Sequence, residues 1–324
     1  MELRKDNNIV CVQRKYDEFE IFKTDTSNWL LDFKQLDSGK FNGELMLMDC
    51  SQVQLINASL DRKFEQHGVT PAGYRTFAIP ADAKQKFQWR GHSISGNNLL
   101  VYPNSGEIDG VNDPGFNIFT ISIANNLIDE FIEIYYPGES NILTSGSEVL
   151  NLSPAKIGLV RRQLQYLISQ VNEHPEKVNT KAFKTIFIEE VPALILNNVL
   201  QNDNKLILPA SRIRDIALGK AVDYIRANTK EMPAVKELCL IAGASSRTLE
   251  YAFKEKYGIG PKDYMRKQLL NKVHQDLIKA DPNHDKIKNV AQKYGFWHMG
   301  QFGADYKKLF MELPSASLTK NSRK

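Results

Sequence analysis

The amino-acid sequence predicts an α+β protein. A β-rich, barrel-like N-terminal domain that ends in helices (residues 1–208) precedes an all-α domain with two helix-turn-helix units (residues 209–324). Three observations predict this arrangement: apolar residues alternate with period two from about Glu44 to Ile123, the period is helical after that point, and a pattern recurs within the C-terminal third. A chain of 324 residues is long enough for about two domains.

Short apolar runs carry the strand pattern, at residues 44–50, 74–80, 98–103 and 115–123. The turn-forming stretches H-G-V-T-P-A-G, R-G-H-S-I-S-G-N-N and V-N-D-P-G separate them. This spacing predicts six to eight strands in a compact β barrel or a double-sheet roll.

Three helices are predicted after the strands, at Ala124–Tyr136, Pro154–Asn172 and Thr180–Gln201. Ser153 is a suitable N-cap and Pro154 suits the first helical position. Pro192 is a site where the third helix can kink, because proline has no backbone N–H. The polar segment Asn202–Ser211 is the predicted domain boundary.

An internal repeat occupies the C-terminal third. One set of positions recurs 52 residues later: Val235, Leu238, Cys239 and Gly243 correspond to Ile287, Val290, Ala291 and Gly295. After a one-residue insertion the offset is 53: Leu249, Phe253, Tyr257 and Pro261 correspond to Phe302, Tyr306, Phe310 and Pro314. Each copy predicts a short amphipathic helix, a glycine turn and a second helix. This is the pattern of a helix-turn-helix unit, whose second helix has an outer face that can enter a major groove.

A single long helix is predicted between the two copies, from Pro261 to about Lys279. About 18 residues at 1.5 Å per residue give roughly 27 Å. Successive major-groove faces on one side of B-DNA lie about 34 Å apart. A spacer of this order suits two recognition helices in successive grooves.

The charge distribution favours a polyanion as partner of the C-terminal third. Residues 209–324 contain 22 Lys and Arg against 12 Asp and Glu, a net charge of +10. Residues 1–208 contain 20 against 26, a net charge of −6. The basic part is therefore the predicted nucleic-acid binder.

Several classes of protein find no support in the sequence. No signal peptide or apolar membrane span is present, so we expect a cytoplasmic protein that does not bind membranes. No hydrolase, nucleotide-binding or metalloprotease motif occurs, so neither catalysis nor a cofactor is expected. The three cysteines are far apart and His67 and His92 are isolated, so no metal site is expected.

The repeat resembles the AraC/XylS family of bacterial transcription regulators. The resemblance rests on E-L-C-L-I-A-G-A-S-S-R-T-L-E-Y-A-F-K-E-K-Y-G-I-G-P-K-D-Y (residues 237–264) and V-A-Q-K-Y-G-F-W-H-M-G-Q-F-G-A-D-Y-K-K-L-F-M-E-L-P-S (residues 290–315). It implies a seven-helix DNA-binding domain whose leading helix is Ile216–Asn228. The second motif is most similar to the branch that includes the ethanolamine-operon regulator. The segments around G-Y-R-T-F-A-I-P and L-L-V-Y-P resemble the sensory barrel found ahead of some such domains. The implied partners are double-stranded DNA, a small-molecule effector, a second copy of the chain and RNA polymerase.

The predicted DNA-binding residues lie on the second helix of each unit or just before it. They are Ser245, Ser246, Arg247, Thr248, Tyr251 and Lys254 in the first unit, and His298, Met299, Gln301, Lys307 and Lys308 in the second. We expect Arg247 to read a guanine and the first unit to supply most base discrimination. In the second unit Gly300 and Gly303 suit either close approach to the groove or packing against another helix. Phe296 and Trp297 are expected to anchor the turn.

The effector site is predicted only by residue type. Arg75 and Arg90 could line a pocket for an anionic or aromatic molecule, and Arg161 and Arg162 could hold a phosphorylated ligand between protomers. The helices 154–172 and 180–201 suit either dimerisation or an intramolecular core. Two other functions remain open: an architectural DNA-binding protein without a ligand, and an enzyme tethered to DNA by its helical part.

Overall fold

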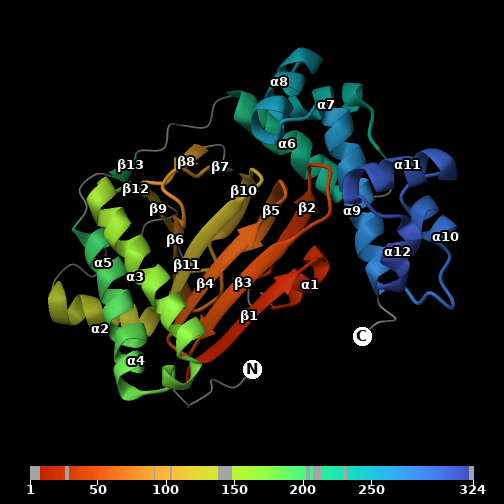
Figure 1. Cartoon of the computed structure of the whole chain (residues 1–324). Coiled ribbons are helices and arrows are strands. Elements are labelled where there is room, and N and C mark those ends of the chain that lie inside the picture. Colours follow the sequence, from red (N-terminus) through yellow and green to blue (C-terminus); the bar gives the residue numbers. More distant parts are fainter. Residues whose placement is uncertain are drawn as a thin grey trace.

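A computed structural model describes residues 8–25, 29–90, 92–102, 104–137, 148–201, 205–206, 213–228 and 232–320. Two antiparallel sheets lie at the centre of the molecule, with helices α2–α5 on one side and helices α6–α12 on the other (Figure 1). None of the helices within these residues combines the length and apolar character that crossing a membrane requires.

The larger sheet has eight strands, and every neighbouring pair is antiparallel. In spatial order they are β1 (Val10–Tyr16), β3 (Gly43–Asp49), β4 (Val53–Leu60), β11 (Phe116–Ala124), β6 (Tyr74–Pro80), β9 (Asn98–Tyr102), β12 (Glu148–Asn151) and β13 (Lys205–Leu206). The smaller sheet has five strands, also antiparallel: β2 (Asp32–Gln35), β5 (Phe64–Val69), β10 (Glu107–Asn112), β7 (Lys86–Trp89) and β8 (His92–Ser95).

The strand arrangement confirms the α+β class and the double-sheet alternative, whereas a closed barrel does not form among the described residues. The predicted number of strands is too low, because β3–β11 alone give nine strands between residues 43 and 124. The strands β5 and β8 lie partly in stretches that the sequence predicted as turns. Polar residues of these strands, such as His67 and His92, pair with neighbouring strands. The sequence pattern did not reveal the strands, because their apolar and polar residues do not alternate clearly.

Both faces of the large sheet are covered. On β11 the side chains of Phe119, Ile121 and Ile123 belong to the same buried core as the α3 residues Ile157 and Val160. Residues of the opposite face pack within the roll formed by the two sheets. Thr120 and Ser122, which alternate with the apolar residues of β11, are therefore buried as well.

The helices on the outer face are α2 (Asn125–Tyr135), α3 (Pro154–Glu173), α4 (Lys181–Thr185) and α5 (Val191–Leu200). Ser153 caps α3 as predicted, since its hydroxyl accepts a hydrogen bond from the Lys156 amide. A kink was predicted at Pro192. The structure has a π-helical segment, Ile186–Glu190, that ends two residues before this proline. Proline cannot donate the α-helical hydrogen bond to Ile188, so a wider turn forms there.

Seven helices follow within the described residues: α6 (Ile213–Ala227), α7 (Val235–Ala242), α8 (Ser246–Tyr257), α9 (Pro261–Lys279), α10 (Ile287–Lys293), α11 (Met299–Phe310) and α12 (Pro314–Thr319). Both predicted helix-turn-helix units are confirmed as α7–α8 and α10–α11, joined by α9. With 19 residues, α9 is about 28 Å long. The predicted boundary between residues 208 and 209 lies outside the described residues.

The helical part packs closely on the sheets. The core of the second unit, with Phe302, Tyr306 and Phe310, is continuous with the aromatic interior around Phe19 of α1 (Phe19–Asp25). The core of the first unit, with Leu249 and Phe253, includes Leu36 and Val111 from the β part. The two units therefore contact the β part separately.

Candidate nucleic-acid interface

Glycine and serine fix the geometry of the first unit, α7–α8. Helix α7 ends at Gly243, whose φ of 62° is accessible to glycine at little steric cost. Helix α8 begins at Ser245, whose hydroxyl accepts a hydrogen bond from the Thr248 amide at 3.1 Å. Ser245, predicted as a DNA-binding residue, therefore has a capping role. Leu249 and Phe253 are fully buried, so the opposite side of α8 faces away from the protein core.

The outward side of α8 carries the predicted polar residues. Ser246, Arg247 and Lys254 are exposed, and Tyr251 is 54% exposed. The Arg247 guanidinium lies 5.6 Å from the centre of the Tyr251 ring, and Lys254 forms a 3.1 Å ion pair with Glu250. These contacts hold the side chains along one face. Thr248 is half-buried beside the cap.

The outward side of α11 is almost bare. A Cβ atom added at Gly300 or at Gly303 would meet no atom within 4 Å among the described residues. No helix of these residues packs there, so the alternative of close helix packing is wrong for this structure. Lys307 and Lys308 are exposed at the end of the same helix. The open face of α11 thus consists of backbone, small residues and two cations.

Five residues around the start of α11 differ in environment. Phe296 packs against Phe302 with ring centres 5.2 Å apart, as predicted for an anchor. Trp297 is 67% exposed, so its predicted anchoring role is wrong. Met299 is half-buried against the core, whereas His298 and Gln301 are exposed, with the Gln301 amide 3.0 Å from Asp305.

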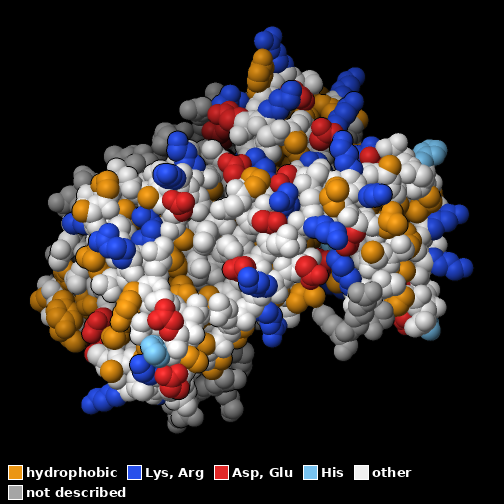
Figure 2. All heavy atoms as spheres, viewed as in Figure 1, with side chains coloured by type: hydrophobic (Ala, Val, Ile, Leu, Met, Phe, Trp, Pro, Cys, Tyr) orange, Lys and Arg blue, Asp and Glu red, His pale blue; other side chains and the backbone are white. Residues whose placement is uncertain are grey.

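Positive side chains extend outward along the top and right of the molecule in Figure 2, where Figure 1 places α8, α10 and α11. This agrees with the excess of Lys and Arg in residues 209–324. A surface of this kind attracts a phosphate backbone through counterion release.

The arginines predicted for an effector have other roles or lie apart. Arg161 is buried on α3 and donates hydrogen bonds to the carbonyls of Pro80 and Gly96 at 3.0 and 2.5 Å. Arg162 beside it is exposed. Arg75 is buried on β6, and Arg90 lies over the Trp89 ring. The structure therefore does not bring these four residues together.

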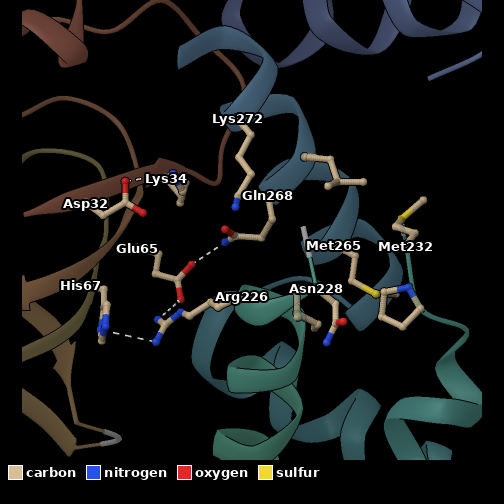
Figure 3. Close-up of a pocket in the computed structure, with 13 residues that line it drawn as sticks. Asp32, Lys34, Glu65, His67, Arg226, Asn228, Met232, Met265, Gln268 and Lys272 are labelled. Atoms are coloured by element: carbon tan, nitrogen blue, oxygen red, sulfur yellow. Dashed lines mark hydrogen bonds and ion pairs between the residues drawn. The ribbon is translucent and has the colours of Figure 1, made fainter. Parts of the chain in front are cut away.

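A pocket of about 240 Å³ lies between the β part and the helices instead (Figure 3). Its lining comes from β2, β5, α6, α9 and the segment before α7: Asp32, Lys34, Glu65, His67, Ile225, Arg226, Asn228, Met232, Pro233, Met265, Gln268, Leu269 and Lys272. The pocket combines an apolar wall with four basic groups. The sequence did not predict it, because its residues come from five separate segments.

Glu65 anchors one side of this pocket although it is only 2% exposed. Its carboxylate accepts hydrogen bonds from Tyr264, from Gln268 at 2.5 Å and from Arg226 at 2.7 Å. Burial raises the pKa of Tyr264 well above its ordinary value, and the carboxylate adds to this effect, so the phenol keeps the proton that it donates. Burial disfavours the charge of Arg226, but Glu65 outweighs burial and raises the pKa of the guanidinium.

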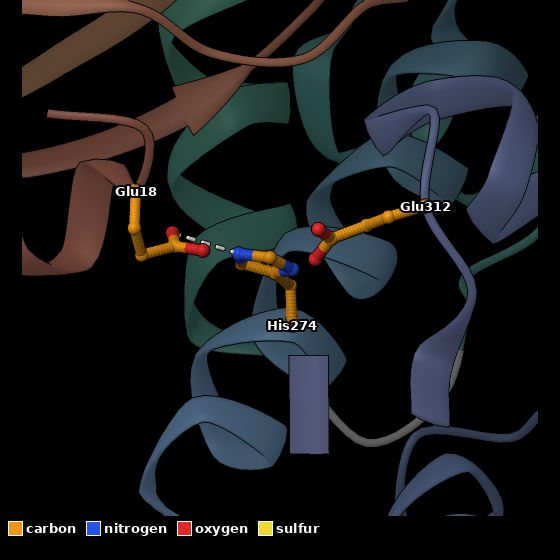
Figure 4. Close-up of side chains that lie close together, drawn as sticks. All are labelled: Glu18, His274 and Glu312. Carbon is orange, nitrogen blue, oxygen red and sulfur yellow. Dashed lines mark hydrogen bonds and ion pairs between the residues drawn. The ribbon is translucent and has the colours of Figure 1, made fainter. Parts of the chain in front are cut away.

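A second buried cluster joins Glu18, His274 and Glu312, which point toward one another from three segments (Figure 4). One side-chain nitrogen of His274 and one carboxylate oxygen of each glutamate all lie within 4.8 Å of one another. The Lys320 ammonium lies 2.9 Å from Glu18 and 2.8 Å from Glu312, so a cation already fills the space between the carboxylates. Burial favours the neutral carboxyl, but His274 and Lys320 outweigh it and lower the pKa of Glu18 to about 2. Sequence analysis missed this cluster because its members lie up to 302 residues apart.

Comparison with known proteins agrees with this geometry. The family model described as "Helix-turn-helix domain" matches residues 238–320, which begin within α7 and end just after α12. The XylDLEGF operon transcriptional activator 2 of Pseudomonas putida is 33% identical over 105 residues, which are 32% of this chain and 67% of that protein. The chain belongs to the AraC/XylS family of transcription regulators. Its residues 238–320 thus form the helix-turn-helix domain of that family.

Other AraC/XylS relatives match over a smaller share of their length. The probable thc operon regulatory protein of Rhodococcus erythropolis is 33% identical over 98 residues, which are 30% of each chain. The match spans about a third of the length of the first relatives found. Members of the family are DNA-binding regulators rather than enzymes.

Solved structures of AraC-type proteins are also similar to the chain. The AraC-like transcriptional activator CuxR covers 88% of this chain and all of its own, at 10% identity and a TM-score of 0.46. A probable AraC family regulator from Rhodopseudomonas palustris covers 32% of this chain and 96% of its own, at 29% identity and a TM-score of 0.30.

Proposed function

We propose that the protein is a sequence-specific, effector-responsive activator of transcription whose helices α8 and α11 enter successive major grooves of DNA. The observation that carries this proposal is the pair of exposed second helices, α8 and α11, at the two ends of a rigid spacer about 28 Å long. The relatives from Pseudomonas putida bear the name of transcriptional activators, which supports activation and contact with RNA polymerase. A cytoplasmic location fits this role.

The two recognition helices divide the work. Helix α8 offers Arg247, Ser246 and Tyr251 for base and phosphate contacts. Helix α11 offers the open face at Gly300 and Gly303, which lets its backbone approach DNA closely while Lys307 and Lys308 meet phosphates. The remaining polar residues of α11 for direct contact are His298 and Gln301. The second motif also favours kinship with the branch of the ethanolamine-operon regulator.

The effector binds in the pocket between the β part and the helices. A ligand there touches both parts, so its binding free energy depends on how the helices sit on the sheets. Among the described residues the Lys272 ammonium has no ion-pair partner, and burial together with Lys34 lowers its pKa. An anionic molecule with an apolar body fits this pocket: its charge would lie near Lys34 and Lys272, and its apolar part would contact Met265 and Leu269.

A second copy of the chain docks on α3. Leu159, Arg162 and Tyr166 lie three and four residues apart, so they share one face of this helix, and all three are exposed. A homodimer through this face gives two DNA-binding domains for a two-part operator.

Selection of binding sites from random and genomic DNA tests this function. The whole protein is used at one stated salt concentration near physiological, because affinity for DNA depends strongly on salt. We expect a recurring site with two recognition segments about one helical turn apart. Binding without any recurring site, with and without cell extract, would instead identify a ligand-independent architectural DNA-binding protein.

A further inference from the structure

A buried histidine connects the second helix-turn-helix unit to the β part. His274 on α9 is 2% exposed and lies between the rings of Phe19 and Phe310, with ring centres 5.1 and 4.3 Å away. Its Nε2 is 2.9 Å from a carboxylate oxygen of Glu18, and its Nδ1 is 2.6 Å from the hydroxyl of Tyr306. Each ring nitrogen therefore has one polar partner, and the two partners come from opposite sides of the domain contact.

The partners of Tyr306 determine the proton on Nδ1. The Tyr306 hydroxyl donates to Ser317 Oγ at 2.7 Å, and Ser317 in turn donates to the Glu312 carboxylate. Burial raises the pKa of Tyr306 well above its ordinary value, so the phenol carries its single proton. Because this proton is directed at Ser317, Tyr306 can only accept from His274. Nδ1 must therefore carry a hydrogen.

The partner of Nε2 is an ionised carboxylate. Glu18 accepts a hydrogen bond from the Lys320 ammonium at 2.9 Å through its other oxygen, and its lowered pKa keeps it charged. An ionised carboxylate only accepts hydrogen bonds, so Nε2 must also carry a hydrogen. A histidine with hydrogen on both ring nitrogens is an imidazolium cation.

The charges of the cluster balance only in this state. The titratable groups that face His274 are Glu18 before α1, Tyr306 on α11, Glu312 between α11 and α12, and Lys320 after α12. Two carboxylates and one ammonium leave one negative charge, which an imidazolium neutralises. A neutral ring would leave that charge uncompensated in a buried site and would remove one hydrogen bond.

We propose that His274 is an imidazolium and that its proton fastens the second helix-turn-helix unit to the β part, so that raising the pH releases this unit. Glu65 holds the first half of α9 and α6 independently, so the release concerns α11 and α12 rather than the whole helical part. The effect of this release on DNA binding rests on the proposed function. The contact of protonated His274 with Glu18 and Tyr306, which we call the latch, does not.

The direction with pH follows from proton linkage. The docked state holds a proton that the released state gives up more easily, so docking is strongest at low pH and weakens as the ring deprotonates. One proton per docking event corresponds to about a tenfold change in the docking constant per pH unit, over the range in which the released ring has lost its proton and the docked ring still holds it.

Nitrogen-15 NMR of the full chain, labelled at histidine, tests the protonation state directly. At pH 6 we expect both nitrogens of the His274 ring, whose signals are identified by their loss in His274→Gln, to be protonated. Amide hydrogen exchange between pH 6 and 9, corrected for intrinsic rates, then reports docking through α1 and α12. Protection there should fall about tenfold per pH unit in the wild type and stay flat in His274→Gln.

His284→Gln is the matched control, since His284 is exposed and its ion pair is with the exposed Asp281 at 3.5 Å. This variant should keep the wild-type pH dependence. A ring nitrogen of His274 without a proton at pH 6, or the same pH dependence in His274→Gln as in the wild type, would overturn the proposal.

Tyr306→Phe tests the same latch if His274→Gln does not fold. It removes the acceptor for Nδ1 but keeps the ring and Glu18, so His274 should lose its proton at a lower pH than in the wild type. An unchanged titration of His274 would contradict the proposal. A wild-type protein that titrates as expected but selects no DNA site would remove the proposed function and leave the latch standing.

Discussion

The Glu65 carboxylate on β5 accepts a hydrogen bond from the Tyr264 hydroxyl on α9, with its two oxygens 2.8 and 2.9 Å from the phenol oxygen, although 199 residues separate them in the chain. Arg226 and Gln268 complete the shell around the same carboxylate. One acidic residue of the β part therefore holds three groups of the helical part, at the edge of the pocket between them.

Replacement of Glu65 by alanine should destabilise the protein by about 3 kcal/mol, because it leaves Arg226 and two further donors without their acceptor in a buried site. Urea unfolding measures this loss. Glu44→Ala serves as control, since Glu44 forms an exposed ion pair with Lys15, and it should cost less than about 1 kcal/mol. Equal costs for the two variants would show that Glu65 does not hold the domains together.

Arg247→Ala should reduce discrimination at one base position by about 1–3 kcal/mol, because a guanidinium reads guanine through two hydrogen bonds. Lys307→Ala should weaken binding to all sequences alike and reduce the salt slope by about one unit, since Lys307 meets only phosphate. Competition binding with a set of single-base variants separates these results. Loss of base preference in Gln301→Ala alone would contradict the assignment of base reading to α8.

Gly303→Leu tests whether α11 lies close to DNA. A Cβ atom added there meets no atom within 4 Å among the described residues, so the substitution should raise stability by about 0.5–1 kcal/mol through helix propensity. On DNA it should obstruct the close approach and weaken binding by at least about tenfold, which is about 1.4 kcal/mol.

Gly219→Leu is its matched control, because Gly219 is an exposed glycine of α6 with equal open space around it. This control should raise stability without changing DNA affinity. Unchanged affinity in Gly303→Leu as well would exclude close approach by α11. Thermal unfolding and fluorescence anisotropy with labelled DNA supply the two measurements.

Glu18→Gln should lower stability at pH 6 by about 3 kcal/mol, which corresponds to the difference between its ordinary pKa of 4.5 and its folded pKa of about 2. Because the folded pKa is lowered, the contribution is complete above pH 4.5 and is lost as the pH falls toward 2. The difference between wild type and variant should therefore shrink over this range in urea unfolding. Asp113→Asn, which alters an exposed ion pair with Lys63, should show a small difference at every pH.

Arg161→Ala should destabilise the protein by about 3 kcal/mol, because the carbonyls of Pro80 and Gly96 lose charged hydrogen-bond donors. The neighbouring Arg162→Ala should change stability by less than about 0.5 kcal/mol, since Arg162 is exposed. Its expected effect is on self-association, which sedimentation measures. Similar stability losses in both variants would argue against a structural role that belongs to Arg161 alone.

The sequence predicted the helical part well because its signals are local. Gly243 and Gly295 adopt positive φ values at the two predicted glycine turns, and Ser153 caps the helix that it was predicted to cap. The β part was predicted less completely, since short polar strands such as β8 depend on their partners rather than on alternation. The exposure of Trp297 was also not predicted, because the sequence does not tell which of the adjacent rings of Phe296 and Trp297 packs against the core.

The sequence by itself determined that this chain has two helix-turn-helix units, how far the helix between them extends, and which face of each second helix points outward. Helical periodicity, capping residues and glycine turns act over a few residues and can be read without a partner. Only the tertiary structure decided how the units are held to the sheets, through Glu65 with Tyr264 and Glu18 with His274. These contacts join residues about 200 or more positions apart. Their energy comes from burial and paired charge, which exist only once the chain has folded.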